Sequence, residues 1–254
     1  MPFNYKTKPY EHQEEALLRS FNRKNYAYFM EMGCGKSKVL IDNITWLYEN
    51  KKIDTAIIIA PKGVYMNWKN AEIPIHLPDN IEKNVYIWKA SANKTEKKVL
   101  EEGVKTRDKL RLLLVNVESF ATAKVIKYLE AFTHRSNFML AVDESTTIKN
   151  IKAKRTKSVL KLGDSAKYKR ILTGSPITQS PMDLYAQCAF LDKDLLGFDS
   201  YWSFQGRYAI IRQTRMGNHS FQQVVGFRNL EELTDKLHRF AYRVTKKEAL
   251  DLPD

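Results

Sequence analysis

Six short runs of apolar residues, bounded by polar or turn-forming residues, follow one another up to residue 174. They predict buried strands at residues 26–30, 55–61, 84–88, 111–117, 138–144 and 169–174. The runs are largely continuous rather than alternating, which is typical of parallel strands that are covered on both faces. The pattern therefore predicts a parallel sheet at the centre of the protein.

Helical spacing separates and follows these runs. In residues 37–49 the apolar side chains share one helical face, and they are Leu40, Ile44, Leu47 and Tyr48. A second helix is predicted over residues 229–244, where Leu230, Leu233, Leu237 and Phe240 recur at intervals of three and four residues. Strands that alternate with helices predict an α/β fold with a doubly wound, mostly parallel sheet and helices on both faces.

The strand signal fades after Pro181. Residues 182–254 predict helices and one small hairpin, whose turn is expected near Gly217 and Asn218. We therefore expect residues 1–254 to form a single lobe, with a core over residues 1–181 and a helical and hairpin appendage over residues 182–254.

Composition narrows the class of protein. A chain of 254 residues with 43% hydrophobic residues is long enough for one large α/β domain. Its two cysteines, Cys34 and Cys188, suggest neither a disulfide framework nor a metal-ligand cluster. The N-terminus has no apolar signal segment, and no apolar run approaches the roughly 18 residues of a membrane span. We expect a soluble, cytoplasmic protein.

The net charge of the chain predicts the kind of partner that it binds. The formal net charge is +13, with 42 Lys and Arg against 29 Asp and Glu, which favours a polyanion, nucleic acid before acidic membrane. The excess is concentrated between Thr147 and Arg170, where Asp164 is the one acid. For any single lysine of this segment, a solvated helix face is the alternative.

Two glycines directly precede a lysine and a serine in the segment EMGCGKS, which follows a predicted strand and begins a predicted helix. Such a context is the one that a phosphate-binding loop requires. Gly33 and Gly35 would let the backbone amides of Met32–Ser37 converge on phosphate oxygens, aided by the positive end of the helix dipole. Lys36 would reach the β- and γ-phosphates, and the Ser37 hydroxyl would ligate Mg²⁺.

Two adjacent carboxylates, Asp143 and Glu144, follow the apolar run FMLAV. Carboxyl ends of parallel strands are where open α/β sheets bind ligands. Asp143 would hold Mg²⁺ and Glu144 would polarise the water that attacks the γ-phosphate, because a metal ion offsets the repulsion between the two carboxylates. An Asp-Glu pair that merely ends a strand is the alternative interpretation.

The order of these motifs resembles the first RecA-like lobe of superfamily-2 helicases, specifically the Swi/Snf-type DNA translocases. Seven segments in order carry the resemblance: KPYEHQEEAL, EMGCGKS, IIAPKGVYMNWKN, LLLVNVESF, DEST with the following TIKN, ILTGSPITQSPMDLYAQCAFL, and LHRFAYRVTKKEALDLPD. The chain departs from the family at Met30, where the fuller phosphate-loop pattern has a glycine, and at Thr146, where a histidine is frequent. The brevity of the lobe looks like phage or bacterial members.

The resemblance implies a P-loop ATP hydrolase with ATP and Mg²⁺ as cofactors. It makes Gln13 the adenine contact and Tyr10 its neighbour, and it routes the coupling between ATP and DNA through Ser145, Thr173, Gly174 and Ser175. The remaining candidates would contact the DNA backbone: Lys62, Asn67, Lys149, Lys152, Lys154, Arg155, Thr178 and Gln179. Trp68, in the same segment as Asn67, is expected to pack inside the protein.

The resemblance also leaves a gap, because nothing in the chain matches the second RecA-like lobe that completes the ATP site in this family. The expected function is the motor lobe of a double-stranded DNA translocase, which is weakly active or inactive until a second lobe joins it in cis or in trans. Two alternatives stay open at this point. One is a nucleotide- and DNA-binding module without hydrolysis, and the other is a strand-separating or RNA helicase.

Overall fold

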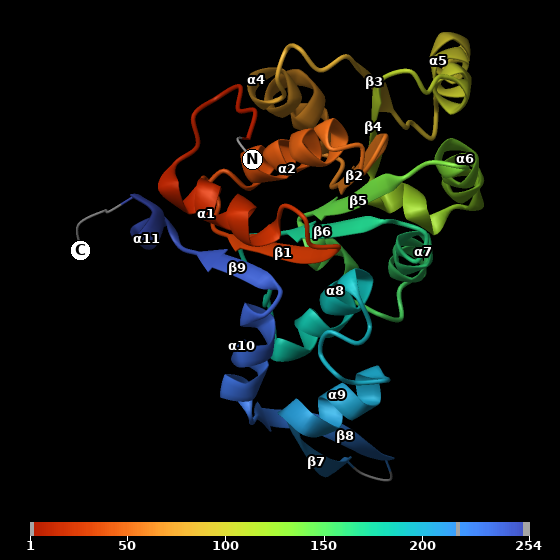
Figure 1. Cartoon of the computed structure of the whole chain (residues 1–254). Coiled ribbons are helices and arrows are strands. Elements are labelled where there is room, and N and C mark those ends of the chain that lie inside the picture. The colour runs from red at the N-terminus through yellow and green to blue at the C-terminus, as the bar shows by residue number, and fades with distance from the viewer. Residues whose placement is uncertain (1–2, 217–218, 251–254) are drawn as a thin grey trace.

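A seven-stranded parallel sheet forms the centre of the computed structural model, which describes residues 3–216 and 219–250 (Figure 1). The strand order is β3-β4-β2-β5-β6-β1-β9. The strands are β1 (Asn25–Met30), β2 (Thr55–Ala60), β3 (Lys83–Ile87), β4 (Leu110–Asn116), β5 (Phe138–Asp143), β6 (Tyr168–Leu172) and β9 (Ala241–Val244). The first six match the predicted strands within two residues at either end. The predicted fold class, a doubly wound parallel sheet, is confirmed.

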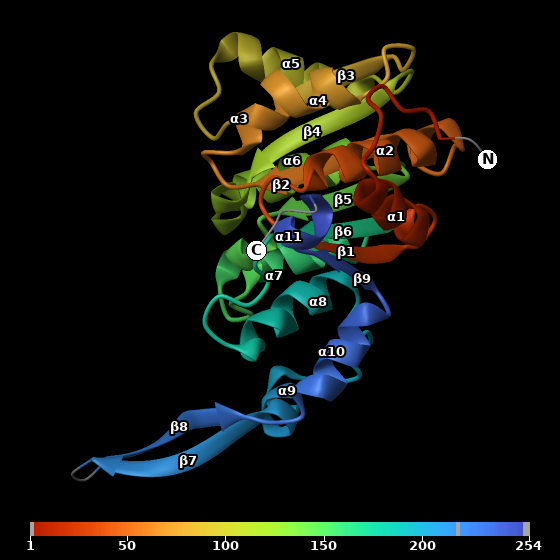
Figure 2. The ribbon, with the colours of Figure 1, turned by 90° about the vertical axis from the view of Figure 1, so that its left-hand side faces the viewer.

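Helices cover both faces of this sheet (Figures 1 and 2). One face carries α1 (Glu11–Ser20), α2 (Lys36–Glu49), α3 (Tyr65–Asn67), the π-helix Trp68–Glu72 and α4 (Ile73–His76). The other carries α5 (Lys94–Lys105), α6 (Ala123–Thr133), α7 (Lys154–Gly163) and α8 (Leu184–Leu191). Short 3₁₀ turns link some elements, at Val117–Ala121, Ser145–Ile148 and Pro181–Asp183.

Alternate side chains of each strand enter the two cores. In β1, Tyr26 and Tyr28 pack with α2, whereas Ala27 and Phe29 pack with the helices of the opposite face. Because both faces are buried, neither side of the strand is polar, which explains the continuous apolar runs in the sequence. Full burial of one large apolar side chain stabilises the fold by about 1.5–3 kcal/mol.

One charge of the basic segment belongs to the interior. Arg170, on β6, is fully buried, and its guanidinium donates to the carbonyl oxygens of Ser20, Arg23 and Lys24 and to Asn43 Oδ1 at 2.8–3.0 Å. These bonds tie β6 to the loop that follows α1. Arg170 therefore contributes to the local charge without facing solvent.

The last part of the chain contributes some elements to the core and a hairpin that projects from it. The remaining elements are α9 (Tyr201–Tyr208), β7 (Ala209–Met216), β8 (His219–Phe227), α10 (Leu230–His238) and α11 (Lys246–Leu250). The strands β7 and β8 form the predicted antiparallel hairpin, which projects from the body in Figure 2. Its predicted turn, Gly217 and Asn218, lies outside the described residues.

The helix predicted over residues 229–244 is wrong at its end. It stops at His238, and Ala241–Val244 form β9, which pairs in parallel with β1. The edge of β1 offers unpaired backbone groups, and pairing with them outweighs the helical spacing of the side chains. Together with α8, β9 brings residues beyond 181 into the main core. In the part of the chain that the structure describes, we found no helix long and apolar enough to cross a membrane.

Candidate ATP site and nucleic-acid face

Four neighbouring strands, β2, β5, β6 and β1, end at the same edge of the sheet. All their pairings are parallel, so the segments that follow them leave on the same side. These segments begin at Pro61, Glu144, Thr173 and Glu31, and they hold most of the residues that the sequence nominates. The fold therefore brings the nominated motifs together.

The glycine loop between β1 and α2 has the backbone that its sequence predicts. Gly33 and Gly35 lie at φ +90° and +79°, in the left-handed region that favours glycine. Gly35 is the N-cap of α2 and offers no side chain to the first amides of the helix. These amides are open to an anion.

Gln13 and His12, both buried, support this loop from α1. His12 Nε2 lies 2.9 Å from the carbonyl oxygen of Cys34, and Gln13 Nε2 donates to the same oxygen at 3.3 Å. Gln13 Oε1 accepts from the backbone amide of Tyr10 at 3.1 Å. The side chain of Cys34 points into the core. The adenine contact of Gln13 stays a prediction. In the structure, the side-chain amide of Gln13 holds the glycine loop through the carbonyl oxygen of Cys34.

We expect Gly35→Ala to distort the loop. The added Cβ would lie 2.2 Å from Gln13 Nε2, and the residue would keep its positive φ. Such strain costs on the order of 1–3 kcal/mol, so thermal unfolding should begin at a lower temperature and the affinity for nucleotide should fall. Gly63→Ala is the matched control, because nothing lies within 4 Å of its added Cβ. Equal stability of the two variants would contradict this account.

Asp143, at the end of β5, is a buried carboxylate whose partners are neutral. Its Oδ2 accepts from Trp68 Nε1 at 2.9 Å and its Oδ1 from the amide of Glu144 at 3.0 Å. Within the described residues, no lysine or arginine forms an ion pair with it. Burial raises the pKa of Asp143 to about 6, although the Trp68 hydrogen bond and the charge of Lys36 oppose that rise.

Glu144 has a strained backbone, at φ +48° and ψ +61°. A glutamate in the left-handed region is uncommon, and such strain is concentrated at functional sites. Its Oε2 accepts from Thr173 Oγ1 at 3.3 Å, and the same hydroxyl accepts from the amide of Ser175 at 3.2 Å. Glu144, Thr173 and Ser175 thus form one hydrogen-bonded chain from β5 to the segment after β6.

These residues fit a magnesium ion that shares its ligands with a nucleotide. Asp143 supplies a carboxylate that forms no ion pair with Lys or Arg among the described residues, and Ser37, in the first turn of α2, supplies a hydroxyl beside the carboxylate of Glu72. Among the described residues, no group of three His, Cys, Asp or Glu could hold a metal alone. Magnesium is usually bound in this manner, through one or two protein groups, substrate phosphates and water.

A cavity of about 400 Å³ lies where these segments meet. Lys36 and Glu144 both line it, and so do Thr146, Gly174 and Lys246. Lys36 Nζ lies 3.4 Å from the carbonyl oxygen of Glu31, and an added Cβ on Gly174 would come within 3.2 Å of the Met32 amide. The candidate lysine, the candidate water-activating carboxylate and the segment after β6 therefore surround one cavity.

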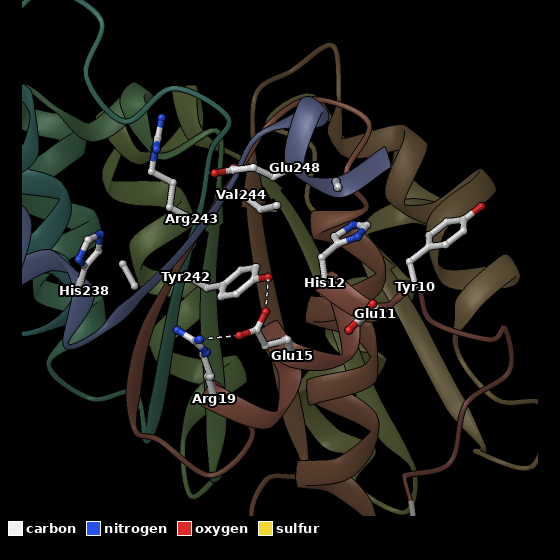
Figure 3. A pocket seen from close by; sticks show the side chains of 12 residues that line it. Tyr10, Glu11, His12, Glu15, Arg19, His238, Tyr242, Arg243, Val244 and Glu248 are labelled. Carbon is white, nitrogen blue, oxygen red and sulfur yellow. Dashed lines mark hydrogen bonds and ion pairs between the residues drawn. The ribbon is translucent and has the colours of Figure 1, made fainter. Parts of the chain in front are cut away.

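A second cavity, of about 940 Å³, lies between α1 and the segment β9–α11 (Figure 3). Tyr10, 65% exposed, and His12 stack there with ring centroids 5.9 Å apart. Glu15 ties the opposite walls, because its carboxylate accepts from Tyr242 Oη at 2.8 Å and pairs with Arg19. The exposed ring of Tyr10, stacked on the buried His12, offers a flat surface that a nucleobase could contact.

Sequence reasoning missed three residues that support the site: Trp68 as a partner of Asp143, Glu72 as a partner of Ser37, and Gln187. Gln187, fully buried on α8, accepts from Ser145 Oγ at 2.6 Å and donates to the carbonyl oxygen of Pro176 at 2.8 Å. It joins the segments after β5 and β6. A glutamine in the otherwise apolar stretch LYAQCAFL was the available signal.

The nominated DNA contacts fall into separate places. Lys149 is tied to Asp183 at 3.3 Å and to the Thr178 hydroxyl. Asp183 also accepts from the amides of Thr178 and Gln179, each at 2.9 Å, which fixes that segment. Lys62 and Asn67 are exposed after β2. Lys154, at the start of α7, lines a different cavity between α6 and α7, and Arg155 is half-buried.

A groove of about 610 Å³ runs between the segment after β5 and the hairpin. Lys152 and Gln179 line one side, and Ile211, Gln222 and Val224 of the hairpin line the other. Lys152 Nζ lies 5.3 Å from the centroid of the Trp202 ring. The acid that lines this groove among the described residues, Asp183, is compensated by Lys149 and by amides, so the groove is basic.

Comparison with known proteins identifies the family. Residues 17–254 match the family described as "SNF2-related domain". The SWI/SNF-related matrix-associated actin-dependent regulator of chromatin subfamily A-like protein 1 of Drosophila melanogaster is 37% identical over 109 residues, which are 42% of this chain and 14% of that protein. The Xenopus laevis protein of the same name is 29% identical over 205 residues, 80% of this chain and 18% of the relative. Protein CHROMATIN REMODELING 24 of Arabidopsis thaliana is 23% identical over 260 residues, 98% of this chain and 23% of the relative.

Solved structures agree on the fold. The Sulfolobus solfataricus SWI2/SNF2 ATPase core in complex with dsDNA aligns with a TM-score of 0.71 at 23% identity, over 100% of this chain and 48% of that chain. The chain thus spans less than a quarter of the curated relatives named here and about half of the solved core. Those curated relatives are eukaryotic, so a phage or bacterial origin stays a prediction. The match over residues 17–254 shows that the chain belongs to the SNF2-related domain family.

Proposed function

We propose that this chain is the ATP-binding lobe of a translocase that moves along double-stranded DNA by hydrolysing ATP. The observation that supports the proposal most strongly is the shared cavity of Lys36 and Glu144, with Asp143 at the adjoining strand end. A cation for phosphate, a carboxylate for water and a carboxylate for metal are the groups that phosphoryl transfer requires.

In this proposal the triphosphate lies on the open amides of α2, with Lys36 against its β- and γ-phosphates. The bound magnesium ion would neutralise charge that develops on the phosphate oxygens. Glu144 would accept the proton of the attacking water, and Thr173 would keep its carboxylate in place. The base would stand against Tyr10 and Gln13.

A second lobe, in the same chain or another, would complete the site from the open side of the cavity. Binding of ATP would close the two lobes and hydrolysis would reopen them, and repeated cycles of closing and opening would move the protein along DNA. The bonds of Thr173 and Gln187 support this coupling: Thr173 lines the cavity and bonds Glu144, and Gln187 bonds Ser145 and also donates to the carbonyl oxygen of Asp183, which lines the groove.

We place the DNA backbone along the basic groove and expect Lys152→Gln to weaken duplex binding at every sequence. One lost phosphate contact should lower the salt slope of the affinity by about one unit. Lys161→Gln is the matched control, since Lys161 belongs to the same basic segment but lines the cavity between α6 and α7. Fluorescence anisotropy at several salt concentrations measures both slopes, and equal slopes for the two variants would exclude the groove.

The proposed function is tested by nucleotide binding and by turnover. Calorimetry should show that the chain binds a non-hydrolysable ATP analogue with Mg²⁺. Hydrolysis should be slow for the chain alone and should rise when the second lobe and duplex DNA are supplied. Duplex binding and a complete second lobe without any hydrolysis would favour the non-hydrolysing module. Stronger stimulation by RNA than by duplex DNA would favour the RNA helicase.

A further inference from the structure

A five-residue π-helix, Trp68–Glu72, contacts both candidate metal ligands. Its first residue donates from Trp68 Nε1 to Asp143 Oδ2 at 2.9 Å. Its last residue is Glu72; burial raises the pKa of that carboxyl, and the side chains of Asn67 and Ser37 beside it oppose the rise. Asp143 ends β5 and Ser37 is the second residue of α2, so one short turn after β2 lies against groups from two other parts of the sheet edge. π-Helical turns are rare and frequently occur at functional sites.

The chemistry of both contacts suits a metal ligand. A tryptophan N–H fixes the orientation of Asp143 but leaves its negative charge uncompensated, whereas an arginine there would neutralise it. A carboxylate beside the Ser37 hydroxyl can accept its proton, which would leave the lone pairs of that oxygen for a metal ion. Groups of this kind, one bond behind the ligands, tune metal sites in proteins.

The residue directly before the π-helix, Asn67, is one of the nominated DNA contacts. Asn67 Nδ2 donates to Glu72 Oε1 at 3.0 Å, and the side chain of Asn67 is otherwise exposed in the segment that the sequence nominates for DNA. A phosphate contact at Asn67 would therefore act on Glu72, and through it on Ser37.

We propose that Trp68 and Glu72 are positioning residues of the magnesium site, and that Asn67 links them to bound DNA. This inference rests on the proposed function. It assigns part of the metal affinity of the lobe to side chains that hold the candidate ligands, Asp143 and Ser37, in place. A purely structural role is the competing explanation for Trp68, because its ring is 1% exposed and packs in the core.

Trp68→Phe separates the two roles, since it keeps a buried ring and removes the N–H. The matched control is Trp88→Phe, because Trp88 is also buried and its Nε1 has no partner among the described residues. Calorimetry with a non-hydrolysable ATP analogue is run at increasing Mg²⁺ and again in EDTA. For Trp68→Phe we expect a 10–100-fold loss of affinity in Mg²⁺, with the affinity in EDTA unchanged. Trp88→Phe should match the wild-type chain in both conditions.

Glu72→Met tests the other contact and carries the experiment if Trp68→Phe fails to fold. It should also lose Mg²⁺-dependent affinity and retain the affinity in EDTA. The DNA link is tested by the factor by which a short duplex changes the affinity for the Mg²⁺·analogue, which is a reciprocal coupling. That factor should fall towards one in Asn67→Ala and stay unchanged in Asn70→Ala, a neighbouring exposed asparagine in the π-helix.

The outcomes distinguish this inference from the proposed function. A wild-type chain that binds no Mg²⁺·analogue would overturn both. A wild-type chain that binds it, together with unchanged affinity in Trp68→Phe and Glu72→Met, would overturn the positioning role alone. Equal losses with and without Mg²⁺, or the same loss in Trp88→Phe, would also overturn it, since packing would then explain the effect.

Discussion

Lys36→Ala should lower the affinity of the chain for Mg²⁺·ATP on the order of 100-fold. Lys36 is the first residue of α2 and lines the cavity that Glu144 shares. A charge-assisted hydrogen bond to phosphate contributes about 1.5–3 kcal/mol, and the alanine variant loses both the bond and the charge. Calorimetry with a non-hydrolysable analogue measures the loss directly and requires no second lobe.

Lys94→Ala provides the matched control for this variant. Lys94 is the first residue of α5, as Lys36 is of α2, and it is exposed. The control should bind nucleotide like the wild-type chain, and both variants should keep the wild-type thermal stability. Unchanged nucleotide affinity in Lys36→Ala would remove the phosphate loop from the proposed function.

Local patterns were enough to predict the central sheet and the main motifs. The apolar runs predicted six strands because those strands are buried on both faces. Each run is therefore continuously apolar and can be recognised without knowledge of its neighbours. The glycines at 33 and 35 predicted the loop because their positive φ depends on the residue and not on distant contacts. Sequence spacing also implied that Asp143 and the loop of Lys36 lie at the same edge of the sheet, because parallel strands share that edge.

Features that depend on distant partners were not predictable in the same way. β9 forms because it can pair with the open edge of β1, and the residues Ala241–Val244 alone carry no signal for that pairing. The partners of Asp143 and Ser37 come from the turn after β2, whose π-helical shape has no local sequence signal. The basic residues of Thr147–Arg170 also lie in different environments that their sequence does not distinguish. Arg170 is buried, Lys149 pairs with Asp183, and Lys152 lines the groove.

Glu144→Gln should retain nucleotide binding, and its turnover rate should fall by roughly 10²–10⁴-fold, which is the usual contribution of a positioned general base. Glutamine has nearly the same shape, tolerates the same backbone strain as glutamate and can still accept from the Thr173 hydroxyl, but it cannot take a proton from water. The affinity for Mg²⁺·ATP should therefore change little. Single-turnover hydrolysis with protein in excess, in the presence of the second lobe, measures even slow rates.

The control is Glu118→Gln. Glu118 follows β4 at the same edge of the sheet, is exposed, and accepts from Asn116 at 3.2 Å without lining the cavity of Lys36 and Glu144. Its variant should hydrolyse ATP at the wild-type rate. If Glu144→Gln turned over as fast as Glu118→Gln, the strained carboxylate at the end of β5 would not be the base, and water activation would have to come from another group that lines the cavity. Loss of binding together with turnover would instead assign Glu144 to the phosphate and metal site itself.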